Sequence, residues 1–202
     1  TFTNNKASEN GGALQYYNGN TESNILTIIN SAFTGNTANN GGALYVRNSA
    51  ANIINTSFTK NNAQSGGAIY TEDGKLNITN SQFIENHAYD GGSIFNEKSN
   101  LIDIANTQFA NNNAKYGGAI RSENGKLILT NNNFTNNHAD YNGGAIYNVG
   151  NIEISDSIFA NNDAEYDGAI DGYRGEISIE NTQFTNNTSE KVGGANGWFG
   201  GA

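Results

Sequence analysis

Acidic side chains recur at fixed spacings in the last third of the chain, where they could form a catalytic or a metal site. Three of them, each 25 residues after the last, are Asp140, Glu165 and Glu190. Three more fall close together: Asp163, Asp167 and Asp171. Paired carboxylates several ångströms apart can cleave glycosides, and clustered carboxylates can bind Ca²⁺. With 19 acidic residues in the chain such groupings also arise by chance. Asp163, Asp167 and Asp171 are therefore weak calcium candidates. We do not expect the protein to be an enzyme.

The composition argues against several other kinds of site. The chain contains no Cys, which removes disulfides, thiolate metal sites and Cys nucleophiles. Neither His87 nor His138 has a second His near it for a metal pair, and we expect no cofactor. The net charge of −9 suits phosphate backbones poorly, so nucleic acid is not an expected partner. No apolar run approaches the roughly 18 residues of a membrane span, so we expect no direct membrane insertion.

A repeat of about 25 residues runs through the whole chain. One Phe marks each unit, at Phe2, Phe33, Phe58, Phe83, Phe109, Phe134, Phe159 and Phe184. Asn stands three residues after every one of these Phe residues. Later in each unit comes a Gly followed by Ala, or once by Ser93. Eight matches in eight units are a far stronger signal than a single motif.

Alternating apolar and polar residues within each unit predict β-strands. Leu76 and Ile78 alternate with Asn77 and Thr79, and the same period of two precedes other Phe residues. Further short strands are expected around the Phe and after the Gly pair. Three short strands per unit predict an all-β, right-handed, single-stranded parallel β-helix (β-solenoid) of about eight coils, stacked about 4.8 Å apart. A leucine-rich repeat has a similar period, but its pattern of leucines is missing.

The repeat also sets the expected boundaries. The β-helix should cover residues 1–195, with a loop insertion near residues 16–24 where the first unit is about five residues longer. Asn196 then replaces the expected Ile and Trp198 is the only Trp, so residues 196–202 are expected to form a cap or docking tail. Open strand edges at the ends of the stack would permit a homo-oligomer that forms by end-to-end stacking.

The regular positions predict what the coils bury. Each Phe and the Ile after the Gly pair should point inward and stack on their equivalents. The Asn that follows Phe should bond the next coil as a ladder, or else lie in a solvated turn. The members of this ladder are Asn36, Asn61, Asn86, Asn112, Asn137, Asn162 and Asn187. A second column, expected to form another ladder, is Asn30, Asn55, Asn80, Asn106, Asn131, Asp156 and Asn181.

A column of outward side chains lies beside the inward Ile. Its candidate ligand-binding members, here named the aromatic column, are Tyr45, Tyr70, Phe95, Arg121 and Tyr147. Rings in register on a flat sheet could stack on sugars or hold a protein partner, and Arg121 could add cation–π or carboxylate contacts. The same rings could instead stabilise the neighbouring strands on which they stand.

The pairing of Gly-Gly-Ala-Ile with Phe-x-x-Asn in every unit resembles the passenger domains of the chlamydial polymorphic outer-membrane proteins. It also looks like the Asn-rich adhesin-like surface proteins of methanogenic archaea. The resemblance covers residues 2–196, although Asp167 replaces the first Gly of one pair. It implies a right-handed β-helix that is displayed outside the cell and used in attachment.

These observations favour a non-catalytic, extracellular or cell-surface, adhesin-like module that binds a glycan or a cell-surface protein through one flat solenoid face. One alternative is a structural subunit that stacks end to end into a filament or sheath, which concentration-dependent rods would favour. The other is a polysaccharide lyase, a hydrolase or a tailspike-like enzyme. Product release from acidic glycans that is lost in Asp163→Asn and Asp171→Asn would favour that enzyme.

Overall fold

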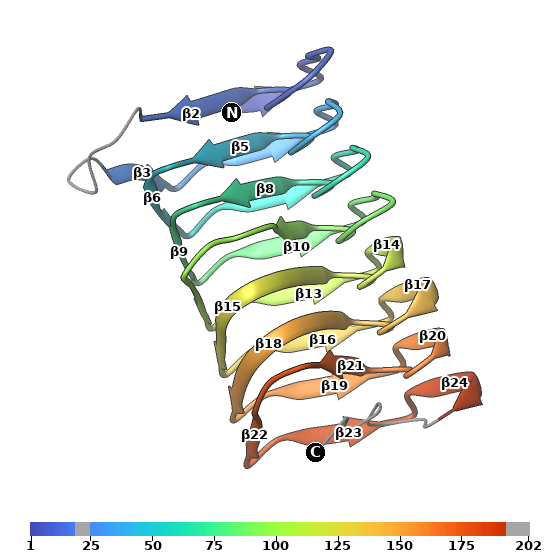
Figure 1. Ribbon diagram of the computed structural model, residues 1–202. Coiled ribbons are helices and arrows are strands. Elements are labelled where there is room, and N and C mark those ends of the chain that lie inside the picture. Colours follow the sequence, from blue (N-terminus) through green and yellow to red (C-terminus); the bar gives the residue numbers. More distant parts are fainter. Residues whose placement is uncertain (19–24, 193–202) are drawn as a thin grey trace.

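The computed structural model describes residues 1–18 and 25–192, and these residues form stacked coils of strands without a helix (Figure 1). Parallel pairing joins each strand to its counterpart in the next coil, so the predicted all-β parallel solenoid is confirmed. The predicted loop near residues 16–24 lies mostly outside the described residues, as do Asn196, Trp198 and the rest of the predicted tail. The described part contains no helix long and apolar enough to cross a membrane.

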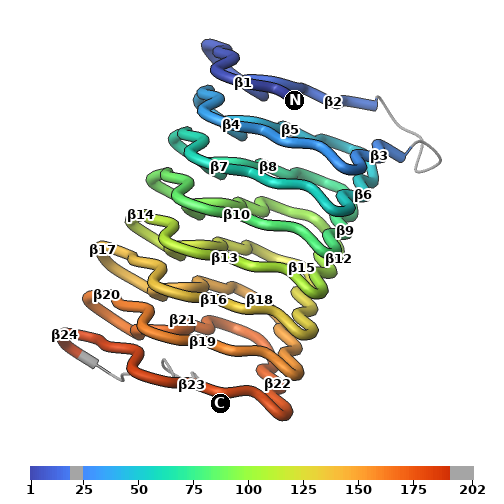
Figure 2. Tube along the Cα trace, turned by 180° about the vertical axis from the view of Figure 1, so that it is seen from behind, coloured from blue at the N-terminus to red at the C-terminus, as the bar shows by residue number. Residues whose placement is uncertain are grey.

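The back sheet carries the repeated Phe residues and faces the viewer in Figure 2. Its strands, in spatial order, are β1 Phe2–Thr3, β4 Ala32–Thr34, β7 Ser57–Thr59, β10 Gln82–Ile84, β13 Gln108–Ala110, β16 Asn133–Thr135, β19 Ile158–Ala160 and β23 Gln183–Thr185. Because every strand pairs Phe with Phe, the coils are in strict register here.

The front sheet begins at the inward Ile or Leu after each Gly pair and turns the next corner of the coil. Its first group of strands is β2 Leu14–Tyr17, β5 Leu44–Arg47, β8 Ile69–Glu72, β11 Ile94–Asn96 and β21 Ile170–Tyr173. Its second group, around the corner, is β3 Ile25–Ile29, β6 Ala50–Ile54, β9 Lys75–Thr79, β12 Leu101–Ala105 and β22 Ile177–Glu180. Two long strands, β15 Ile120–Thr130 and β18 Ile146–Ser155, run through both groups.

A short third sheet, here named the corner sheet, follows the back strands in the later coils. Its strands are β14 Asn113–Tyr116, β17 His138–Asn142, β20 Asp163–Tyr166 and β24 Thr188–Val192. In Figure 1 the chain runs to the left along the front strands and to the right along the more distant ones while it descends from the N-terminus. The solenoid is therefore right-handed, as predicted from the general preference of parallel crossovers.

The interior is a thin apolar stack. The fully buried Phe residues form a stack of nearly parallel rings with centroids 4.7–4.9 Å apart: Phe33, Phe58, Phe83, Phe109, Phe134 and Phe159. Ile69, Ile94 and Ile120 are buried beside them in the same core. The inward Phe and Ile columns are therefore as predicted.

The predicted Asn ladder is present and runs through the buried side of the coils. Asn137 shows its pattern: the backbone N–H and the side-chain amide both donate to Oδ1 of Asn162, at 3.0 and 2.9 Å. Oδ1 of Asn137 accepts the corresponding two bonds from Asn112 of the preceding coil. The same side-chain amide also donates to the carbonyl of Phe109 at 3.0 Å, so each Asn satisfies groups of three coils. In buried polar groups that are fully bonded in this way, the hydrogen bonds offset the cost of removing the groups from water.

The second Asn column differs from the prediction. Asn55, Asn80 and Asn106 are exposed rather than inward, and each has a positive φ of 49–53°. They form the corner before the Phe strand, and Asn tolerates this left-handed conformation better than most residues. Side-chain bonds join only some neighbours, such as Asn55 to Asn30 and Asn131 to Asn106, at 2.7 Å each.

The residue after each of these corner Asn residues forms a ladder that the sequence interpretation missed. Its buried members are Thr56, Ser81, Thr107, Asn132 and Ser157. The N–H of Thr107 donates to Oδ1 of Asn132 at 2.9 Å, and the N–H of Asn132 donates to Oγ of Ser157 at 3.0 Å. Short hydroxyl and amide side chains thus bond the coils at a second edge of the core.

The two glycines of each pair have different tasks. Gly91 has φ 60°, which glycine adopts without steric penalty at this corner. Gly92 lies so close to the next coil that an added Cβ would be 2.1 Å from the carbonyl oxygen of Gly118. The first position therefore favours glycine for its conformation, and the second requires glycine for the close approach of two backbones.

Candidate functional site

The aromatic column stands in register on the front sheet, but most of its rings are covered. Tyr45 pairs with Tyr70, and Tyr70 pairs with Phe95. Only 5–8% of each of these three residues is exposed, and they form a small hydrophobic cluster separate from the main core. Their rings lie 5.2 and 5.3 Å apart. This packing fits the strand-stabilising role that the sequence also allowed, and it leaves little ring surface for a ligand.

Acidic residues at the ends of the front strands cover this cluster. The hydroxyl of Tyr45 donates to Glu72 at 3.1 Å, and the hydroxyl of Tyr70 donates to Glu97. Burial, followed by the negative charge of Glu72, raises the pKa of Tyr45 to about 12. Burial and the bond to Glu97 likewise raise the pKa of Tyr70. Both phenols are therefore uncharged donors at physiological pH.

Arg121 continues the aromatic column and connects it to Asp90, which lies at the corner beside Tyr116. Its guanidinium lies over the rings of Phe95 and Tyr147, at 5.5 and 5.3 Å from their centroids, and pairs with Asp90 and Glu123. Burial lowers the pKa of Arg121, but the charges of Asp90 and Glu123 raise it more. Arg121 is thus already neutralised by two carboxylates, and it serves as a bridge between faces more than as a free cation.

A second set of aromatic residues lies at the outer edge of the corner, and the sequence interpretation did not identify it. The set, here named the tyrosine ladder, comprises Tyr89, Tyr116, Tyr141 and Tyr166. Successive rings meet edge to face at 5.0–6.0 Å, with interplanar angles of 63–75°. Tyr89 and Tyr141 are 47% and 39% exposed, so this ladder presents ring surface that the aromatic column does not.

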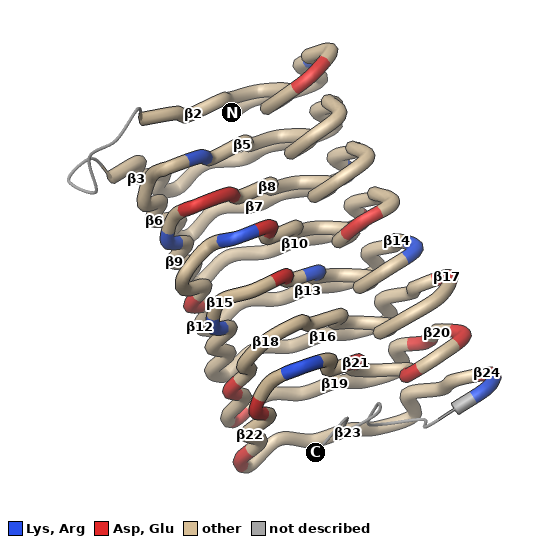
Figure 3. Tube along the Cα trace, viewed as in Figure 1, with Lys and Arg blue, Asp and Glu red and all other residues tan. Residues whose placement is uncertain are grey.

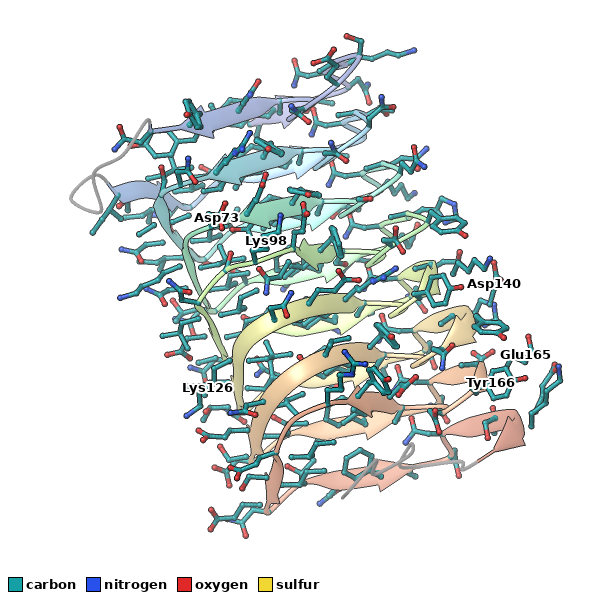
Figure 4. All side chains as sticks on the ribbon, in the orientation of Figure 1. Asp73, Lys98, Lys126, Asp140, Glu165 and Tyr166 are labelled. Atoms are coloured by element: carbon teal, nitrogen blue, oxygen red, sulfur yellow. The ribbon has the colours of Figure 1, made fainter. Side chains whose placement is uncertain are left out.

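Basic side chains lie over the tyrosine ladder. Lys115 lies 5.0 Å from the ring centroid of Tyr89 and 5.4 Å from that of Tyr116, and its ammonium donates to the hydroxyl of Tyr89 at 3.0 Å. Lys191 lies 5.4 Å from the ring centroid of Tyr166 and pairs with Glu165. The surface therefore combines aromatic rings with charged donors and acceptors (Figure 4).

An acidic groove of about 360 Å³ crosses the adjoining face of the corner sheet. The members of its rim that carry charge or titrate are His138, Asp140, Asp163, Glu165 and Glu190. Figure 3 shows acidic residues gathered at and beside β20. Within the groove, Nδ1 of His138 lies 2.6 Å from Asp163, and Nε2 lies 3.2 Å from Asp140. Burial lowers the pKa of His138, but the bonds and charges of Asp163 and Asp140 raise it above its ordinary value.

The three weak calcium candidates are not brought together. Asp163 belongs to the His138 groove, whereas Asp171 accepts a hydrogen bond from Asn142 on the front side. Among the residues that the structure describes, no group of three or more acidic, His or Cys side chains is placed to hold a metal. Asp163 is therefore separated from Asp167 and Asp171, because it lies on β20 of the corner sheet whereas Asp171 lies on β21 of the front sheet.

A signal for the tyrosine ladder was present in the sequence. The ring lies four residues after the ladder Asn in three coils, as Tyr116 follows Asn112, but Tyr89 lies only three residues after Asn86. The distance from each of these Tyr residues to the first Gly position alternates between two residues and one. The series is therefore irregular when positions are counted from the Gly pair. The corner strands accommodate this difference by register shifts between coils.

Comparison with protein families supports the proposed resemblance. The Chlamydia polymorphic membrane protein repeat matches the chain at residues 1–15, 30–47, 55–72 and 133–149, about a third of its length. Neither curated proteins nor solved structures gave a match. The resemblance to archaeal adhesin-like proteins stays a prediction. Four stretches of the chain are thus similar to the Chlamydia polymorphic membrane protein repeat, and all four lie in one continuous solenoid.

Proposed function

We propose that the protein is a non-catalytic, adhesin-like module of the extracellular or cell surface that binds a glycan through the tyrosine ladder. Tyr89 and Tyr141 carry this proposal, because they expose ring surface on a scaffold whose other aromatic columns are buried. Sugar rings have apolar faces that pack on aromatic rings, and their hydroxyls bond to nearby charged groups. The similarity to the Chlamydia polymorphic membrane protein repeat supports a location at the cell surface.

The arrangement of the ladder favours an oligosaccharide over a single sugar. Tyr89 and Tyr141 are two coils apart, which is about 10 Å along the solenoid axis. A ligand that contacts both rings must be longer than one sugar ring and must lie along that axis. Lys115, between them, can bond a hydroxyl or a carboxylate of such a ligand.

A glycan array tests this proposal with a double variant, Tyr89→Ala/Tyr141→Ala. Each lost ring contact is worth about 1 kcal/mol, so we expect at least a tenfold loss of affinity for the oligosaccharides that the wild type binds. The matched control is Tyr17→Ala/Tyr173→Ala, which removes two tyrosines of similar exposure outside the ladder. Unchanged binding by the ladder variant, or an equal loss in the control, would overturn the proposal. Binding to proteins but to no glycan would do the same.

A further inference from the structure

Asp167 occupies a position that glycine holds in the other coils. Its φ is 58°, close to the 66° of Gly143 at the same place in the coil before. A Cβ at Gly143 would meet the carbonyl oxygen of Ile146 at 2.1 Å, so a side chain here is crowded as well as conformationally unfavourable. An aspartate at this corner therefore needs an explanation beyond local folding.

One carboxylate oxygen of Asp167 is buried and lacks a hydrogen-bond partner. Asp167 is 4% exposed, and its Oδ1 is a buried oxygen with no hydrogen-bond partner. Burial, followed by the charge of Asp171, raises the pKa of Asp167 to about 6. At neutral pH this group is thus a buried anion without compensation, which is unfavourable unless a positive charge is supplied.

Asp171 is the second acid at this corner. It is 7% exposed, and its carboxylate accepts a hydrogen bond from the amide of Asn142. Burial raises its pKa, and the bond from Asn142 opposes that rise. Among the ion pairs of the described residues, none includes either carboxylate. Two buried carboxylates therefore lie near this corner, and neither forms an ion pair with a basic side chain of the described residues.

We propose that Asp167, Asp171 and Asn142 form a binding site for a divalent cation of the calcium type. Both carboxylates supply hard oxygen ligands, and rotation of the Asn142 amide turns its oxygen toward the cation in place of its NH₂ group. Water and backbone oxygens complete the coordination that Ca²⁺ requires. The cation neutralises the two acids and braces the corner next to Tyr166 of the tyrosine ladder. This site goes beyond the proposed glycan binding and does not depend on it.

Terbium luminescence and thermal unfolding test the site in the whole chain. Tyr147 pairs with Asp171 on the neighbouring strand, so tyrosine excitation should sensitise Tb³⁺ bound there. We expect Tb³⁺ emission that Ca²⁺ displaces, and a rise in Tm of about 5 °C at saturating Ca²⁺. Asp167→Gly should abolish both responses, and it restores the residue of the other coils, so this variant should fold.

The matched control is Asp163→Asn, which removes one acid of the same coil from the His138 groove and should leave both responses unchanged. Calcium responses that persist in Asp167→Gly would overturn the proposal, because the ion would then bind elsewhere on the acidic surface. A Tm that ignores Ca²⁺ but rises as the pH falls from 7 to 5 would overturn it too. That result would show that the two acids share a proton instead of a cation.

Discussion

The buried Phe column and the tyrosine ladder are two stacks of aromatic rings on the same coils, yet their geometries differ. The Phe rings are parallel within 8°, at centroid distances of 4.5–5.0 Å. The tyrosine rings meet at 63–75°. Parallel rings at these centroid distances and edge-to-face rings are both favourable aromatic arrangements. Inside the solenoid the strict register of the Phe strands keeps the rings parallel, whereas the corner strands shift register between coils and the tyrosine rings are tilted.

This difference predicts unequal dependence of stability on the two columns. Phe109→Ala removes a fully buried ring from the stack and should lower the free energy of unfolding by about 3–5 kcal/mol. Tyr116→Ala removes a half-buried ring with edge contacts and should lower it by about 1 kcal/mol. Urea denaturation of both variants measures the two effects. Equal losses would show that the tyrosine ladder is a structural element rather than a binding surface.

A second comparison sets buried against exposed Asn within one coil. Asn112→Ala removes the acceptor of the Asn86 N–H, the side-chain bond to the carbonyl of Phe83 and one of the two bonds that Oδ1 of Asn137 accepts. Each unsatisfied buried group costs about 1–3 kcal/mol, so we expect a loss of about 3 kcal/mol in unfolding free energy.

Asn106→Ala is the control for that change, because it alters the same residue type at an exposed corner. It should cost about 1 kcal/mol, mostly through its positive φ. The same denaturation experiment compares the two variants. A loss at Asn106 as large as the loss at Asn112 would contradict the assignment of the ladder as the main polar support of the coils.

The smallest expected effect concerns the acidic groove. The folded state raises the pKa of His138 above its unfolded value of about 6.5. The contribution of His138 to the stability of the folded state is therefore fully present below pH 6.5, and it is lost as the pH rises through the pKa of the folded state. His138 is 41% exposed, so solvent screening limits the effect to about 0.5 kcal/mol or less.

Thermal unfolding at pH 5.5 and pH 8 measures this contribution in the wild type and in His138→Gln. The variant should lose the small extra stability at low pH. His87, an exposed residue of the same column beside Asn62 and Asn113, supplies the control variant His87→Gln. If His87→Gln changed the pH profile as much as His138→Gln does, the pairing of His138 with Asp163 would not be the cause of the pH dependence.

Much of the fold could be predicted from the sequence, but less of the candidate site. Phe, the ladder Asn and the second Gly recur in every coil, and each position meets its own equivalent, so pattern alone indicated inward Phe and bonded Asn. The corner Asn residues were predicted to point inward because the alternation of the strand was extended beyond the end of the strand. Asn80 lies after that end, where the chain turns with a positive φ. Nothing in the spacing distinguished the covered Tyr45 from the exposed Tyr89.

By itself the sequence determined the repeat, the strand register and the identity of the core columns. The physical reason is that a side chain repeated every 25 residues in stacked coils has its own counterpart as nearest neighbour. Only the tertiary structure decided which outward residues are accessible. Exposure depends on how one corner lies against another face: Glu72 covers Tyr45, Arg121 is drawn to Asp90, and Asp167 is left buried beside Asp171. Contacts of that kind join residues at unrelated positions of the repeat, and a periodic pattern does not encode them.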